Sequence, residues 1–542
     1  MSEYDFIVIG AGSAGCAVAT RLAERENLSV LLLEAGGLDS NFWIHVPLGV
    51  GKLLQDTRYV WPFSTEAEGQ LQGQSIYWPR GKVLGGSSSV NGMVYVRGDP
   101  IEFDHWEQIG NRGWGYDSVA PFYKRLECYP EGDPRLRGHD GPVHIMNRGT
   151  WDPDPLSDSF LTACTQMGIS HTEDYNAGPY EGVSYLQQTA YRGRRWSAAD
   201  AYLRTTGRKR NLTIKTHATA SRIILSGSRA KGVEYYNDGK SHTAYSRHEV
   251  LLCAGSIQSP QLLELSGIGR PEVLEGCGVP VLHALPGVGE SLQDHLQVRM
   301  TYKCTRPITI NDIMQNPVRR WAAGLRYLLT HRGLLSTTSS TVHALTRSES
   351  GAQRPDIKIQ IALISGQNRY SRSTKMGIDN WPGFSLGVFM LRPESRGSVH
   401  ISGPKIGDSP VIRANYLSRE RERTTYLNAM RVIRGIASQP ALRALTSEET
   451  RPGPNANTDL ALIDYIGRTG QTSWHPISSC RMGTDEMAVV DDRLRVRGLD
   501  GLRVIDASVM PTMVSSNTNG PALMIGEKGA DMVLGDLEGR AT

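Results

Sequence analysis

The chain has 542 residues, of which 39% are hydrophobic and 21% charged, a composition that fits a folded globular protein and excludes fibrous and disordered classes. Its formal net charge is only +4, and long runs of like charge are lacking, so the sequence shows no electrostatic footprint for nucleic acid. No stretch approaches the roughly 20 apolar residues of a membrane-spanning helix. The sequence therefore predicts neither a nucleic-acid partner nor a transmembrane segment.

The seven cysteines are scattered, with no CxxC pair and no spacing typical of a metal site. Dispersed cysteines of this kind indicate free thiols in a reducing compartment. The first residues lack the basic segment and the cleavable apolar segment of a signal peptide. We therefore expect no bound metal and a cytoplasmic location, with peripheral attachment to the inner membrane left open.

The first forty residues carry the clearest local pattern. Residues 6–9 form an apolar run typical of a strand buried on both faces, Gly-Ala-Gly-Ser-Ala-Gly follows at 10–15, and residues 16–25 have helical spacing. A second apolar run at 30–33 ends at Glu34. This order is the βαβ fingerprint of dinucleotide binding, in which glycines let the backbone approach a pyrophosphate and the carboxylate holds a ribose hydroxyl. Because Glu34 would repel a 2′-phosphate, the pattern favours FAD or NAD over NADP.

The rest of the chain alternates between loops, strands and helices. Alternating runs from about residue 211 predict short strands and hairpins in a small sheet appended to the nucleotide-binding domain. Helical spacing at 321–329 and 419–436, with strand patterns at 357–363 and 384–391, predicts a second, inserted layer. A final strand and helix after residue 502 return to the first layer. The pattern as a whole predicts an α/β fold.

The densest glycine and serine cluster lies within residues 79–92 and contains Gly85, Gly86 and three consecutive serines. It lacks the GxSxG elbow of serine hydrolases. We therefore interpret it as backbone packed against a flat cofactor rather than as a nucleophile loop.

Two polar segments near the C-terminus are candidates for catalysis. His475 lies in Trp-His-Pro, and an imidazole with its usual pKa of about 6.5 can accept a proton from an alcohol. Its position is equally compatible with a loop histidine held by one hydrogen bond. The segment 515–521 is compatible with an Asn-Gly turn or with an amide that donates a hydrogen bond to a substrate oxygen. Spacing alone leaves these alternatives open.

Five ordered segments resemble the glucose-methanol-choline (GMC) family of FAD-dependent oxidoreductases, and most closely its choline dehydrogenase-like and alcohol dehydrogenase-like members. They are the N-terminal fingerprint with Glu34, the first family signature at 79–98, the second at 255–269, residues 391–399 and the block 504–531. The resemblance implies a Rossmann-type FAD-binding domain with a parallel sheet and an inserted substrate-binding domain with an antiparallel sheet covered by helices. The expected FAD-binding domain comprises residues 1–155, 200–310 and 462–542, and the expected substrate-binding domain comprises 156–199 and 311–461.

The resemblance also implies roles for individual residues. His475 would be the base that deprotonates the substrate hydroxyl, and Asn517 would hydrogen-bond the substrate oxygen. Some members attach FAD through a histidine at the position of Val90, so non-covalent FAD is expected here. The expected FAD contacts are Gly10, Gly12, Ser13, Ala14, Gly15, Glu34, Ala35, Trp61, Gly85, Gly86, Asn91, Gly92, Met93, Val94, Ala220, Ala254, Trp474, Asp506, Ala507 and Pro521.

The expected reaction is the oxidation of a primary alcohol to the aldehyde, with hydride transfer to flavin N5 and electrons passed to a quinone or another carrier. An alcohol oxidase that reduces O₂ to H₂O₂ is the first alternative, and a non-redox lyase on the same scaffold is the second. Residues 311–460 show no pattern typical of a cage for a quaternary ammonium, so a neutral alcohol is favoured over choline. The oligomeric state stays open.

Overall fold

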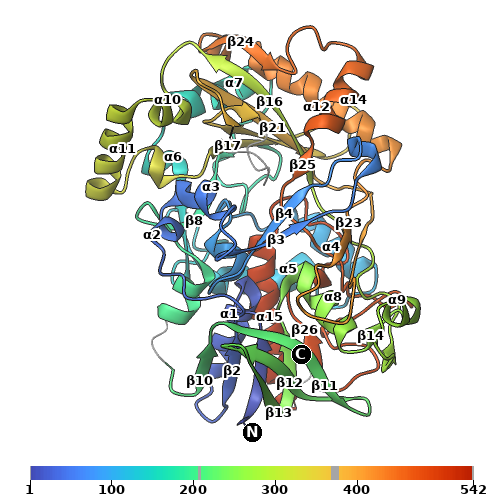
Figure 1. Cartoon of the computed structure of the whole chain (residues 1–542). Coiled ribbons are helices and arrows are strands. Elements are labelled where there is room, and N and C mark those ends of the chain that lie inside the picture. Colours follow the sequence, from blue (N-terminus) through green and yellow to red (C-terminus); the bar gives the residue numbers. More distant parts are fainter. Residues whose placement is uncertain (1, 206–208, 368–376, 540–542) are drawn as a thin grey trace.

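A seven-stranded sheet forms the lower half of the molecule in Figure 1, a computed structural model that describes residues 2–205, 209–367 and 377–539. The strand order is β10, β2, β1, β13, β12, β11, with β26 also paired to β13. The strands are β1 (Ser2–Ile9), β2 (Val30–Leu33), β10 (Leu212–Lys215), β11 (Ala218–Ser226), β12 (Arg229–Asn237), β13 (Lys240–Leu252) and β26 (Leu502–Val504).

Strand β13 joins two kinds of pairing in one sheet. It runs parallel to β1 and, over its last three residues, parallel to β26, whereas its first half pairs antiparallel with β12. The prediction of a separate appended sheet is therefore wrong in detail, because the β11–β12 hairpin continues the nucleotide-binding sheet through the 13 residues of β13. Strand β10 also differs from the expected hairpin, since it pairs parallel with β2.

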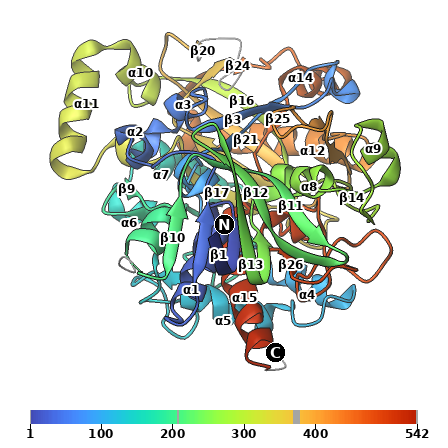
Figure 2. The same ribbon diagram turned by 60° about the horizontal axis from the view of Figure 1, so that its bottom comes forward.

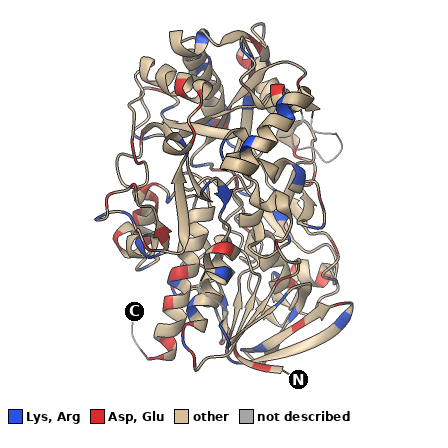
Figure 3. Cartoon of the chain, turned by 90° about the vertical axis from the view of Figure 1, so that its left-hand side faces the viewer, with Lys and Arg blue, Asp and Glu red and all other residues tan. Residues whose placement is uncertain are grey.

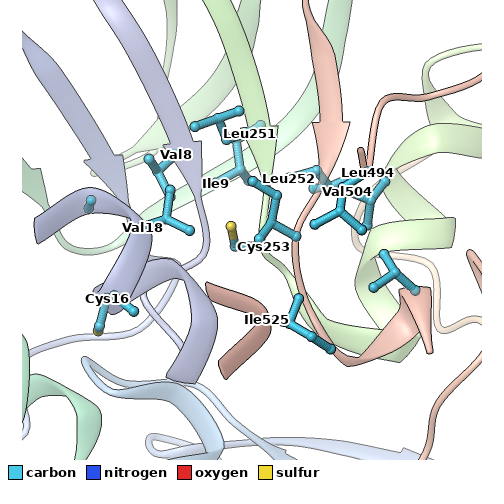
Figure 4. Packing of buried hydrophobic residues seen from close by; sticks show 14 of the residues in the cluster. Val8, Ile9, Cys16, Val18, Leu251, Leu252, Cys253, Leu494, Val504 and Ile525 are labelled. Atoms are coloured by element: carbon cyan, nitrogen blue, oxygen red, sulfur yellow. The ribbon is translucent and has the colours of Figure 1, made fainter. Parts of the chain in front are cut away.

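Two helices fix the middle of this sheet, α1 (Ser13–Ala23) and α15 (Asn519–Leu537). A Cβ added to Gly526 of α15 would lie 2.7 Å from the carbonyl oxygen of Ala14, so only glycine permits this close approach of the two helices. The core between helices and strands is built from fully or nearly fully buried apolar side chains (Figure 4). Those labelled are Val8, Ile9, Cys16, Val18, Leu251, Leu252, Cys253, Leu494, Val504 and Ile525.

A second seven-stranded sheet forms the upper half of the molecule and is antiparallel throughout (Figure 1). Its strands are β7 (Gly182–Tyr185), β16 (Leu296–Cys304), β17 (Ser340–Thr346), β18 (Ile357–Ala362), β21 (Gly383–Met390), β24 (Thr446–Arg451) and β25 (Gln471–Thr472). One face is covered by α7 (Pro155–Gln166), α12 (Glu420–Ala437) and α14 (Asp459–Thr469). The predicted fold class, a Rossmann-type domain plus an antiparallel sheet covered by helices, is confirmed.

Side-chain alternation gives the second sheet two different faces. In β18, Ile357, Ile359 and Ile361 pack in the core beneath the helices. Because successive side chains of a strand point to opposite faces, Lys358 and Gln360 lie on the other face. The same alternation in β16 and β21 brings Gln297, Arg299 and Phe389 to this second face, which closes over the first half of the molecule.

The expected boundary at residue 310 does not coincide with the edge of the second sheet. Strand β16, which lies before this boundary, pairs with β21, and β25, which lies after residue 462, pairs with β16. The change of composition near residue 311 therefore falls inside the second layer rather than at its start. The other expected domain boundaries stay predictions.

Surface features agree with the composition. Lys and Arg residues are interspersed with Asp and Glu residues over both halves of the chain (Figure 3). All seven cysteines are free thiols, as expected from their spacing. Among the described residues, none of the helices combines the length and the apolar character needed to cross a bilayer.

A buried ionic cluster fixes the chain beyond the glycine and serine loop. The carboxylate of Glu127 accepts hydrogen bonds from Tyr95 Oη at 2.6 Å, Arg97 Nε at 2.7 Å and Arg137 Nε at 2.9 Å, and all these groups are buried. Burial raises the pKa of Glu127, but the charges of Arg97 and Arg137 outweigh it and hold the pKa at about 2. Its stabilising contribution is therefore complete above the ordinary value of 4.5 and is lost as the pH falls through about 2.

The variant Glu127→Gln should unfold at a markedly lower urea concentration than the parent protein. It leaves the guanidinium group of Arg97 buried without its counter-charge and leaves Arg137 paired only with Asp174, which costs about 3 to 5 kcal/mol. Urea titration at neutral pH, followed by circular dichroism, measures the loss. The control is Asp133→Asn, since Asp133 pairs with Arg135 on the surface and such pairs contribute little. Equal midpoints for the two variants would show that the cluster does not stabilise the fold.

Candidate active site

The glycine motif at residues 10–15 forms the turn that leads from β1 into the N-terminus of α1. A Cβ on Gly15 would lie 1.9 Å from the carbonyl oxygen of Gly10, so this turn requires glycine. A Cβ on Gly12 would meet nothing within 4 Å, because this residue faces open space. No side chain caps α1, so the backbone N–H groups of its first turn are available to an anion.

The glycine and serine loop packs directly on this turn. Gly86 has a φ of 53°, and a Cβ at this position would lie 2.7 Å from the Cα of Gly12. The backbone N–H of Gly85 donates to the carbonyl oxygen of Ala11 at 2.8 Å. The loop is therefore backbone packed closely against the dinucleotide turn, and its predicted packing against a flat cofactor stays a prediction.

Glu34 closes the other side of the turn. Its carboxylate accepts hydrogen bonds from the backbone N–H of Ala11 at 3.0 Å and of Gly36 at 2.8 Å. Burial raises its pKa to about 7, and these two hydrogen bonds oppose the rise. Because two backbone donors hold both oxygens, the carboxylate is oriented before any ribose hydroxyl arrives.

Two adjoining cavities contain most of the expected site residues. The glycine-lined cavity is bordered by Gly10, Gly12, Ser13, Ala14, Glu34, Ala35, Trp61, Gly86, Ala220, Ala254, Asp506 and Ala507. The histidine cavity is bordered by Ser13, Asn91, Gly92, Met93, Val94, Trp474, His475, Ala507 and Asn517. They share Ser13, Arg80, Ser87, Ala507 and Ala522 and so form one elongated site.

Three expected FAD contacts do not border either cavity. Gly15 and Gly85 lie beneath the turn, where they permit its close packing, and Pro521 is buried in the first turn of α15. The remaining residues form an extended cradle with an open glycine, an uncapped helix N-terminus and an oriented carboxylate. This donor set fits a dinucleotide, whose pyrophosphate needs close backbone approach and whose ribose needs an acceptor.

Two consecutive residues from a distant part of the chain, Asp294 and His295, hold His475 in place. Its backbone N–H donates to the carboxylate of Asp294 at 2.6 Å, and its Nδ1 lies 2.9 Å from Nδ1 of His295. The preceding Trp474 has a φ of 61°, an uncommon conformation for a bulky residue. Arg80 secures it by donating from Nη1 to the Trp474 carbonyl oxygen at 2.9 Å. Asp294, His295 and Arg80 therefore determine where the imidazole lies.

The hydrogen bonds of the two histidines set the proton positions. His295 Nε2 lies 3.1 Å from the carbonyl oxygen of Leu391, which can only accept, so this nitrogen carries the proton. Burial lowers the pKa of His295 to about 3, so the ring is neutral and its Nδ1 accepts. His475 must then donate from Nδ1. Burial, with the charges of Lys358 and Arg80, lowers the pKa of His475 well below 6.5, so its Nε2 carries a lone pair.

Asn517 and Lys358 complete the chain from the other side. Lys358 Nζ donates to Asn517 Oδ1 at 2.8 Å and to Ser516 Oγ at 3.0 Å. Since the amide oxygen is occupied by this donor, Asn517 Nδ2 faces His475 Nε2 at 2.9 Å as a donor. Burial lowers the pKa of Lys358 to about 7. The lone pair of His475 Nε2 thus accepts the Asn517 amide N–H at the wall of the histidine cavity, in a hydrogen-bond chain whose directions are fixed at both ends.

The structure brings together the two expected catalytic residues, and it adds four that the sequence did not single out: Arg80, Asp294, His295 and Lys358. Lys358 alternates with isoleucines in its strand, and this pattern predicts an ordinary side chain that faces solvent. Arg80 belongs to the first family signature, and its positive charge is the feature of the sequence that could have indicated a role in the site. His295 and Asp294 precede a strand with no distinguishing motif.

The histidine cavity has a cationic character. Its lining includes Arg80 and Arg299, and among the described residues that border it there is neither an aspartate nor a glutamate. Burial lowers the pKa of Arg80 to about 10, opposed by Asp294 and Asp506, so the side chain stays charged at neutral pH. Lys358 Nζ also lies 5.8 Å from the centre of the Phe389 ring, so a cation already approaches one aromatic wall of this cavity.

Comparisons with known proteins identify the family of this chain. Two family models described as GMC oxidoreductase match residues 4–297 and 393–526. The oxygen-dependent choline dehydrogenase of Vibrio vulnificus is 40% identical over 98% of this chain and 94% of its own length. Human mitochondrial choline dehydrogenase is 39% identical over 98% of this chain and 90% of its own. The crystal structure of pyridoxine 4-oxidase from Mesorbium loti has a TM-score of 0.88 and 32% identity, and covers 97% of this chain and 98% of that chain. The chain therefore belongs to the GMC oxidoreductase family and is an FAD-dependent oxidoreductase that acts on alcohols.

Proposed function

We propose that the protein oxidises a neutral primary alcohol to the aldehyde, with His475 as the base that takes the hydroxyl proton. The hydrogen-bond chain that leaves a lone pair on His475 Nε2 beside the dinucleotide cradle carries this proposal. FAD, held by the cradle when bound, supplies the acceptor for the hydride that leaves the alcohol carbon.

Substrate binding rearranges one hydrogen bond. The alcohol O–H replaces Asn517 Nδ2 as the donor to His475 Nε2, and the freed amide N–H donates to the alcohol oxygen. Lys358 keeps the amide in this orientation by holding Asn517 Oδ1. As the proton moves to Nε2, the amide donor and the nearby ammonium favour the negative charge that develops on the oxygen.

The cavity favours a neutral substrate over choline, the substrate in the names of the sequence relatives. A quaternary ammonium would enter a cavity lined by Arg80 and Arg299 and would gain no carboxylate from the described lining residues. Like charges brought together cost several kcal/mol, which corresponds to a discrimination of about 100-fold or more.

We propose a quinone or another carrier as the electron acceptor, with O₂ as the alternative acceptor. We also propose a cytoplasmic location.

A panel of alcohols mixed anaerobically with the holoenzyme tests the proposed reaction. Neutral primary alcohols should bleach the flavin absorbance, and choline should do so with a kcat/KM at least about 100-fold lower than the best of them. Bleaching by choline as fast as by the best neutral alcohol would contradict the substrate assignment. Failure of every alcohol to bleach the flavin would instead favour the lyase alternative.

Two further measurements complete the assignment. Comparing H₂O₂ formation with dye reduction during turnover separates an oxidase from a dehydrogenase. Denaturing the holoenzyme should release all the FAD, because the hydrocarbon side chain of Val90, which borders the histidine cavity, offers no nucleophile for a covalent link.

A further inference from the structure

Helix α11 (Pro317–Thr330) stands at the outer edge of the molecule, next to the short helix α10 (Ile310–Gln315), in both views of the whole chain (Figures 1 and 2). Tyr327 is the only residue of α11 that is buried. The helix therefore contacts the rest of the chain along a narrow strip and leaves most of its surface open.

The open surface of α11 is apolar. The exposed fractions are 76% for Val318, 80% for Trp321, 57% for Leu325, 62% for Leu328 and 75% for Leu329. At 100° per residue these five side chains fall within an arc of about 100°, on the side of the helix opposite Tyr327. An amphipathic helix normally turns its apolar stripe to the core, so this outward stripe indicates a surface with a partner.

The charged side chains of α11 itself all have one sign. Arg319 and Arg326 lie along one flank of it, Arg320 is also exposed, and the sequence contains no Asp or Glu between residues 313 and 348. Arg326 reaches back to Asp152 at 3.1 Å. A second copy of the chain would bring the same arginines face to face, whereas anionic lipid headgroups complement them. Tryptophan and leucine beside arginine is the composition of helices that lie in a membrane interface.

We propose that α11 anchors the protein to the surface of an anionic lipid bilayer, with Val318, Trp321, Leu325, Leu328 and Leu329 inserted among the lipids. Its 14 residues extend about 21 Å, less than the roughly 30 Å of a bilayer core, so the helix lies along the surface and does not span it. The flanking arginines remain at the level of the headgroups.

The position of α11 links this surface to the histidine cavity. The chain runs from α11 through the short helix at Leu334–Ser336 to Thr338, Ser339 and Ser340, which border that cavity. Lipid binding at α11 would therefore act on a segment that continues directly into the wall of the histidine cavity. The inference itself does not depend on the alcohol chemistry.

Flotation of the holoenzyme with lipid vesicles tests the proposal. The protein should float with vesicles of phosphatidylcholine and phosphatidylglycerol, float less with phosphatidylcholine alone, and bind less as the salt concentration rises. The variant Trp321→Ser/Leu325→Ser/Leu329→Ser should lower the binding constant at least about tenfold. The matched control Leu38→Ser/Leu282→Ser/Leu460→Ser, which removes equally exposed leucines elsewhere, should bind like the parent.

The same preparations contain the checks. Dye reduction in solution should be equal in all three proteins, which shows that the variants are folded. If the parent protein stays out of the floating fraction, or if the α11 variant floats as well as the parent, the proposal is wrong. If light scattering shows a dimer that the α11 variant dissociates, a second copy occupies the stripe and the lipid assignment is overturned.

Discussion

Replacing His475 by alanine should slow alcohol-dependent flavin reduction by about 10²- to 10⁴-fold, the usual contribution of a positioned base. The variant should retain its FAD, because the cradle around Gly12 and Glu34 does not depend on the imidazole. Anaerobic stopped-flow mixing measures the rate constant, and the absorbance spectrum measures the flavin content. His105→Ala, a change of an exposed histidine on the surface, is the control and should reduce at the parental rate.

The pH dependence of the parent enzyme gives an independent check on this assignment. Burial, with the charges of Lys358 and Arg80, lowers the pKa of His475 well below its ordinary value of 6.5. The base is then unprotonated at pH 6.5, and the rate should fall only when the pH drops well below this value. An acidic limb centred at or above 6.5, or reduction of His475→Ala at the parental rate, would exclude His475 as the base.

Replacing Lys358 by methionine should slow flavin reduction by about 10- to 100-fold, the equivalent of one hydrogen bond from a charged donor. Without Nζ the amide of Asn517 can turn, and its oxygen then faces the lone pair of His475 Nε2. The glutamine variant keeps a donor for Asn517 Oδ1 without the charge, so Lys358→Gln should recover part of the rate.

A second readout distinguishes this positioning role from a loss of packing. Burial lowers the pKa of Lys358 to about 7, so the parent loses the ammonium charge as the pH rises through about 7. The parental rate should decline over this range, and the decline should be absent from Lys358→Met. Equal pH profiles for the two proteins, with equal rates, would show that Lys358 does not act through Asn517.

The N-terminal half of the site could be predicted from the sequence because its contacts are local. The glycine turn, α1 and Glu34 lie within one βαβ unit, and the backbone geometry requires glycine at Gly10 and Gly15. The Gly85–Gly86 loop could be interpreted in the same way, since a dense run of glycines has few uses other than close packing.

The other half of the site depends on contacts across long stretches of chain. His475 and His295 are 180 residues apart, and Lys358 and Asn517 are 159 apart. Their proximity follows from the order and register of the strands in the second sheet. Neither can be predicted from the periodicity of a single strand. The resemblance to a family pointed to His475 and Asn517, but the residues that orient them could only be found from the structure.

The alternation in the second sheet has a consequence for how such an enzyme changes over evolutionary time. The isoleucines of β18 bind the strand to the helices, while Lys358 and Gln360 of the same strand face the site. A substitution at Gln360 or Gln297 can therefore alter what the cavity accepts without creating a void in the helix-covered core. The residues that stabilise the fold and the residues that line the cavity lie on opposite faces of the same strands. New substrate preferences can therefore arise by single substitutions that leave the fold unchanged.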